Sequence, residues 1–97
     1  MNVQYVGEPK RPANGAAVFR IDAEADGHPF VCTITEEAIR TAAGGSVPQT
    51  PSEMVTYFRR HEQRFREVAA AMLAGSNPLP ANLKIRDADL RREVVSG

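Results

Sequence analysis

The chain has few of the residues that build metal sites, disulfide frameworks or membrane spans. One cysteine and two histidines stand among its 97 residues, so no intramolecular disulfide can form and no ligand pairs occur at the spacing of a zinc site. No run approaches the roughly 18 apolar residues of a membrane-spanning helix. The first fifteen residues have no apolar segment like that of a signal peptide. We therefore expect no metal, no cofactor, no membrane contact and a cytoplasmic location.

An excess of charge of either sign is also lacking, because twelve basic residues balance twelve acidic ones. This balance argues against a nucleic-acid partner, which is usually recognised by surplus basic charge. The hydrophobic content of 42% and the charged content of 25% are those of an ordinary globular domain. We expect a short edge strand and a loop in residues 1–15, and one small domain in residues 16–97.

The clearest positive signal is a pair of alternating runs around Asp26-Gly27, in "AAVFRIDAEADGHPFVCTIT". Asp-Gly favours a two-residue hairpin turn. With that turn, Ile21 lies opposite Cys32, and the period of two puts one apolar set on a single face. That set comprises Phe19, Ile21, Ala23, Phe30, Cys32 and Ile34.

Cys32 therefore falls in the middle of the apolar face of the hairpin. Free cysteine is among the most buried residue types and packs as a small hydrophobe. A catalytic thiolate needs positive charge or a helix N-terminus nearby, and some exposure. The pattern favours core packing for Cys32, which stays only a weak candidate for a nucleophile.

Two helices are expected after the hairpin. Thr35 is the predicted N-cap of a short one, with acids in its first turn, and Gly44-Gly45 ends it. Thr50 and Glu53 form a capping box for a second, amphipathic helix of about 23 residues that ends at Gly75. Its apolar stripe consists of Met54, Tyr57, Phe58, Phe65, Val68, Ala69, Met72 and Leu73.

The C-terminal part predicts a strand over 83–86, with Asp87 as the N-cap of a final turn that holds Leu90 and Val94. The expected fold class is therefore α+β. An antiparallel β-hairpin is extended to a sheet of three or four strands, one long amphipathic helix packs on one face, and there is one short helix.

The order of these segments resembles a known family. A strand like "AVFRI", a "DG" turn, "VCTITEEAI", a helix like "YFRRHEQRFREVAAAML" and a closing "LKIRDADL" are similar to the DUF1488 family of small bacterial proteins. The resemblance covers about residues 16–90, and Gly27, Cys32 and Ile34 match the family's G-x-x-x-x-C-x-I pattern. It implies a small bacterial α+β domain, and it implies no active-site residues.

His61 is the second weak candidate for catalysis. It lies in the apolar arc of the long helix, between Phe58 and Phe65, where a histidine is usually a core or border residue with one hydrogen bond. The alternative is a proton-transfer group that works near neutral pH. It would then need a second group, for which there are three candidates: Cys32, Glu62 and Asp87. With Cys32 it would form a Cys–His pair.

Three classes of function remain. The favoured one is a non-catalytic protein-interaction or regulatory module that self-associates as a dimer. The others are a nucleic-acid-associated protein that uses the arginine-bearing helix, and a small enzyme or ligand-binding protein that uses Cys32 and His61. Residues 19–40 hold two arginines and five acids, a net charge of −3. In a two-fold dimer this region would meet basic residues in the helix or C-terminus of a second copy.

Overall fold

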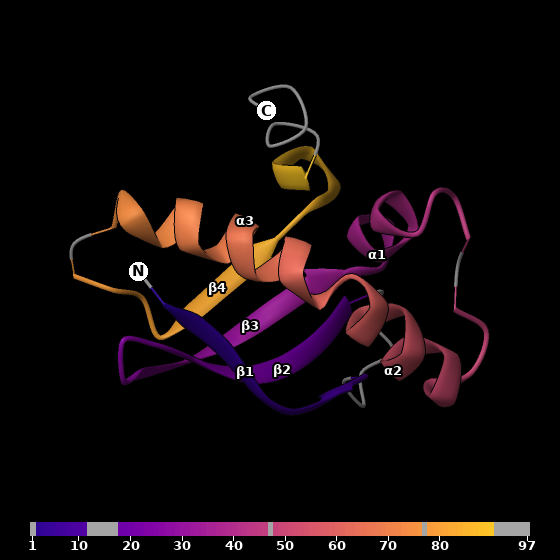
Figure 1. Cartoon of the computed structure of the whole chain (residues 1–97), viewed down its shortest axis with the longest axis horizontal. Helices are drawn as coiled ribbons and strands as arrows, with labels where there is room; N and C mark the ends of the chain where they lie inside the picture. The colour runs from indigo at the N-terminus through magenta and orange to yellow at the C-terminus, as the bar shows by residue number, and fades with distance from the viewer. Residues whose placement is uncertain (1, 12–17, 47, 77, 91–97) are drawn as a thin grey trace.

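The computed structural model describes residues 2–11, 18–46, 48–76 and 78–90, and shows a four-stranded sheet with helices on one face (Figure 1). The strands are β1 (Val3–Lys10), β2 (Val18–Ala25), β3 (His28–Thr35) and β4 (Asn82–Ile85), in the spatial order β1-β2-β3-β4. The helices assigned in these residues are α1 (Glu36–Ala42), α2 (Pro51–Arg60) and α3 (Glu62–Ala74). The predicted α+β fold class is confirmed.

The hairpin of β2 and β3 has the predicted register. Ile21 pairs with Cys32, and Ala25 pairs with His28 across the turn. Both turn residues have positive φ, 51° for Asp26 and 85° for Gly27, as a type I′ turn requires. The apolar set of the hairpin is buried against the helices, so the alternation of the sequence correctly identified the inner face.

The two outer strands differ in direction. β1 lies at one edge, as predicted, and is antiparallel to β2, but it extends through Pro9 to Lys10, where a loop was expected. Its edge position allows the proline, and its pairing shifts between Val6 and Lys10. Gly7 lies at this irregularity with a φ of 85°, a conformation that glycine adopts without strain. β4 pairs parallel with β3 at the other edge, because the helices carry the chain back across the sheet between the two strands.

The short helix α1 begins and ends as predicted. The Thr35 hydroxyl accepts a hydrogen bond from the amide of Ala38 at 3.1 Å. Gly44 and Gly45 follow the helix with positive φ. Ile39 and Ala42 are buried in the core, so α1 covers the end of the sheet next to β3.

The prediction of one long helix is wrong, because the chain breaks at His61 into α2 and α3. Thr50 caps α2 as expected, with its hydroxyl accepting from the Glu53 amide at 3.1 Å. His61 has φ −111° and ψ 15°, which interrupts the helix. The change of direction is visible in Figure 1. It lets both segments bring their apolar side chains onto a twisted sheet, and the buried residues are Met54, Phe58, Phe65, Val68, Ala69 and Leu73.

After β4 the chain turns into a helical segment over 87–90. Asp87 is its first residue, and not the residue before it as predicted. The Asp89 carboxylate accepts a hydrogen bond from the Arg86 amide at 2.9 Å. Leu90 is fully buried, as expected. Val94 lies outside the described residues.

Candidate functional site

Cys32 is completely buried between the sheet and the helices. Its sulfur lies 3.9 Å from the Tyr5 hydroxyl, which is its hydrogen-bonding neighbour. Burial raises the pKa of the thiol to about 12, although the contact with Tyr5 works in the opposite direction. The thiol is therefore protonated at neutral pH. The predicted position of Cys32 in the core is confirmed, and its surroundings do not activate it.

Tyr5 is a polar core residue that the sequence reasoning did not single out. Its hydroxyl donates to the carbonyl oxygen of Phe65 at 2.8 Å and so joins β1 to α3. Its ring meets the Phe58 ring edge-on at 5.1 Å between centroids. Burial raises the pKa of Tyr5 far above its ordinary value of 10.0, so the phenol stays protonated. The alternation of "NVQYV" placed Tyr5 on a strand, but its partners come from a helix sixty residues away.

His61 stands at the junction of α2 and α3 with its side chain partly exposed. Its backbone amide donates to the carbonyls of Tyr57 and Phe58, both at 3.2 Å. Burial, and then the neighbouring Arg60 and Arg64, lower the pKa of its imidazole below 6.5. Within the described residues no hydrogen bond joins His61 to Cys32, whose polar neighbour is Tyr5. The structure therefore does not bring the two weak candidates together.

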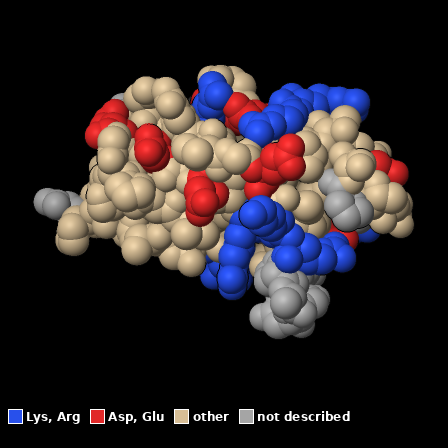
Figure 2. All heavy atoms as spheres, turned by 90° about the horizontal axis from the view of Figure 1, so that it is seen from below, with Lys and Arg blue, Asp and Glu red and all other residues tan. Residues whose placement is uncertain are grey.

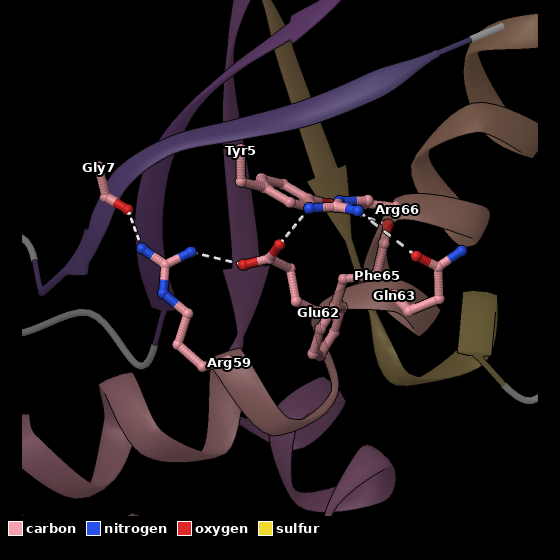
Figure 3. A network of polar contacts seen from close by, with 7 residues as sticks. All are labelled: Tyr5, Gly7, Arg59, Glu62, Gln63, Phe65 and Arg66. Atoms are coloured by element: carbon pink, nitrogen blue, oxygen red, sulfur yellow. Dashed lines mark hydrogen bonds and ion pairs between the residues drawn. The ribbon is translucent and has the colours of Figure 1, made fainter.

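Glu62 links the two helices to β1 (Figure 3). One oxygen of its carboxylate forms an ion pair with Arg59 of α2, and the other forms an ion pair with Arg66 of α3. The pairing of Glu62 with Arg66 follows the i, i+4 spacing that the sequence contains. Arg59 also donates to the carbonyl oxygen of Gly7 at 2.6 Å, at the irregular part of β1. With a side chain only 17% exposed, Glu62 fixes the helix junction against the edge strand.

The arginines of α2 and α3, which suggested nucleic-acid binding, have contacts within the molecule. Arg59 and Arg66 are both held by Glu62. Arg64 donates to the carbonyl oxygen of Leu90 at 3.5 Å. Arg60 lies near the ring of Tyr57, 6.0 Å from its centroid. The helices therefore do not present their arginines as one unpaired basic stripe.

The outer face of the sheet is the face that the helices leave uncovered (Figure 1). Its side chains form cross-strand rows because residues paired across strands point to the same side. One row contains Lys10, Arg20, Thr33 and Lys84; the next contains Val6, Asp22, Val31 and Asn82; the third contains Gln4, Glu24 and Pro29. We call these the basic row, the central row and the acidic row.

Two shallow hollows occupy this outer face. The first, about 540 Å³, is lined by Lys10, Arg11 and Arg20 as well as by Glu8 and Asp22. The second, about 380 Å³, lies towards the acidic row, where Glu24 and Pro29 line it. Val6, Asp22 and Val31 line both hollows and separate them. Val6 is 50% exposed, which makes the central row the apolar part of this face.

The side of the molecule seen from below shows how the charges are distributed. Lys and Arg side chains gather in two groups, at the top and in the lower centre of the view, whereas Asp and Glu side chains lie between these groups and also to the left of them (Figure 2). A third hollow, of about 250 Å³, lies between β2 and the starts of α1 and α2. Arg11, which pairs with Glu36 at 3.5 Å, and the buried Phe19 and Met54 contribute to its walls.

The described part of the chain holds no group of three or more His, Cys, Asp or Glu side chains able to bind a metal ion. Among the helices in that part, none has both the length and the apolar character needed to cross a membrane.

Comparison with known proteins adds no assignment: no family model, no curated protein and no solved structure matches the chain. The resemblance to DUF1488 therefore rests on the quoted segments alone.

Proposed function

We propose that the protein is a non-catalytic interaction module that self-associates through the outer face of its sheet. The observation that carries the proposal is the one-sided arrangement of the fold. The helices cover one face, and the other face offers the exposed Val6 among charges of both signs. Small domains often complete such a half-covered sheet with a second copy, because their own core is limited.

The chemistry of Cys32 supports a non-catalytic role. A thiol whose pKa is raised to about 12 is a poor nucleophile near neutral pH. The single cysteine fits a reducing compartment, so we place the protein in the cytosol. By its resemblance to DUF1488, we take it to be bacterial.

Sedimentation velocity of the wild-type chain tests the proposal directly. We expect a dimer that gains population with protein concentration and loses it between 0.05 and 0.5 M salt, because screening weakens contacts between exposed charges over about 10 Å at 0.1 M. A chain that stays monomeric at high concentration and low salt would refute self-association.

One observation favours a second candidate, association with nucleic acid. Lys10, Arg20 and Lys84 share the basic row, although the total charge of the chain is zero. Fluorescence anisotropy with short single-stranded DNA and RNA would test this candidate. Salt-sensitive binding that Arg20→Glu abolishes would support it, and the absence of binding at low salt would exclude it.

A further inference from the structure

The charges on the outer face are sorted along β2. Arg20 belongs to the basic row, Asp22 to the central row and Glu24 to the acidic row, with all three on one face of a single strand. Positions two residues apart on a strand lie about 7 Å from each other. The surface charge therefore changes from positive to negative over about 7 Å along β2.

The basic row has no acidic partner within the described residues. Lys10 lies directly opposite Arg20 on the neighbouring strand, and like charges in such positions destabilise a sheet. The ion pairs found in that part of the chain involve Arg11, Arg59 and Arg66, and none involves the basic row. A carboxylate from another molecule would relieve this repulsion.

We infer that two copies stack their outer faces with β2 antiparallel to its own copy, about a two-fold axis that passes between the basic row and the central row. The inference rests on the proposed self-association and specifies its geometry. The axis exchanges the two rows, so Arg20 of each copy lies over Asp22 of the other. The parallel orientation would instead place Arg20 over Arg20 and Asp22 over Asp22.

The apolar residues of the face fit the same arrangement. Val6 and Val31 belong to the central row, so the axis places them under Lys10 and Thr33 of the basic row of the second copy, which cover them. Stacked sheets pack about 10 Å apart with interdigitating side chains. The two hollows provide room for this interdigitation, since they adjoin on either side of the central row.

A second copy suits this face better than a polyanion does. Glu8 and Asp22 line the same hollow as Lys10 and Arg20, and Glu24 lies one row beyond. A nucleic acid laid over the basic row would meet these carboxylates. Arg20 and Asp22, which lie in neighbouring rows, are instead complementary to the same two residues of a second copy, as an isologous interface requires.

Neutralising variants distinguish the two orientations. In the antiparallel stack, Arg20→Gln and Asp22→Asn each remove both symmetry-related attractions, so each should weaken dimerisation at least about tenfold at low salt. In the parallel stack the same changes would remove repulsion and strengthen the dimer. A strengthened dimer overturns the inference.

Charge exchange provides the decisive test. Arg20→Glu alone and Asp22→Arg alone should each give a monomer, whereas the double variant, and an equimolar mixture of the two single variants, should dimerise again. Arg60→Glu changes the net charge as much as Arg20→Glu does, but it lies on α2 in the other layer, and it should leave the dimer intact.

The results would distinguish the stacking geometry from self-association as such. A wild-type dimer that is insensitive to charge changes at Arg20 and Asp22 would overturn the stacking geometry and leave self-association standing. A monomeric wild-type chain would overturn both. A monomer that binds single-stranded nucleic acid through Arg20 would establish the polyanion as the occupant of this face.

Discussion

The Tyr5 hydroxyl donates a hydrogen bond to the carbonyl oxygen of Phe65 at 2.8 Å, and this contact ties the edge strand β1 to the first turn of α3. The Phe65 ring stacks on the Phe58 ring at 5.8 Å, and Phe58 in turn meets the edge of Tyr5. One aromatic cluster therefore joins β1, α2 and α3. The edge strand is part of the core through its side chains, as well as part of the sheet.

Removal of the Tyr5 hydroxyl should reveal the contribution of this link. Tyr5→Phe keeps the ring contacts and deletes the donor, so we expect it to lower the free energy of unfolding by about 0.5–1.5 kcal/mol in urea titrations. Tyr57→Phe is the matched control, since the Tyr57 ring lies at the border of the core. Equal effects of the two substitutions would show that the hydrogen bond to Phe65 adds nothing.

Cys32 should react slowly with a thiol reagent in the native state and rapidly in denaturant, because its side chain is fully buried. Cys32→Ser should destabilise the protein by about 1–3 kcal/mol, since the neighbouring Tyr5 hydroxyl lies 3.9 Å from the sulfur, which is too far for an ordinary hydrogen bond to a buried serine hydroxyl. Cys32→Ala adds no polar atom and should cost less. Fast labelling of the folded protein, together with normal stability of the serine variant, would instead indicate a reactive surface thiol.

Stability should fall at alkaline pH through Cys32 and Tyr5. Both groups have folded-state pKa values above their unfolded values, which are 9.0 for the thiol and 10.0 for the phenol. Their contributions to the free energy of unfolding are thus fully present below pH 9 and are lost as pH rises toward 12. Where a group titrates only in the unfolded chain, the loss is about 1.4 kcal/mol per pH unit. Unfolding measured between pH 7 and 11 checks this. Cys32→Ala should remove the part of the decline that begins near pH 9, and an unchanged decline would contradict the assignment.

Glu62→Gln should loosen the junction of the two helices. The substitution removes the charge that holds Arg59 and Arg66, and we expect a loss of about 1 kcal/mol, since partly exposed ion pairs contribute little individually. The difference from wild type should shrink in 1 M salt. Glu67→Gln, on the exposed side of α3 and without an ion pair among the described contacts, should change stability by less than about 0.5 kcal/mol. A Glu62→Gln variant as stable as wild type at low salt would mean that packing alone holds the junction.

Much of the fold was predictable because its signals are local. Asp26-Gly27 determined the turn, and with it the whole register of β2 and β3. Thr35 and Thr50 capped their helices as predicted, because a side chain reaches an amide three residues on without help from the rest of the chain. Burial of Cys32 followed from alternation alone.

The break at His61 had a local signal in the charges around it, but the continuous apolar stripe of the two helices favoured a single helix. Arg59 and Arg60 are basic residues in the last turn of α2, and Glu62 is an acid in the first turn of α3. These are the charges that helix ends favour. The apolar spacing from Phe58 to Phe65 is compatible with one straight helix, so periodicity could not reveal the change of direction.

Tertiary structure decided the contacts that join distant segments. It placed Tyr5 against Phe65, set β4 parallel to β3, and brought Lys10, Arg20 and Lys84 into one row although they are spread over most of the chain. Helix caps and turns depend on residues that are close in sequence, so they form in nearly the same way in any tertiary context. Pairing between distant strands depends on which apolar faces can be buried together, so the composition of the outer face emerged only when the whole sheet was assembled.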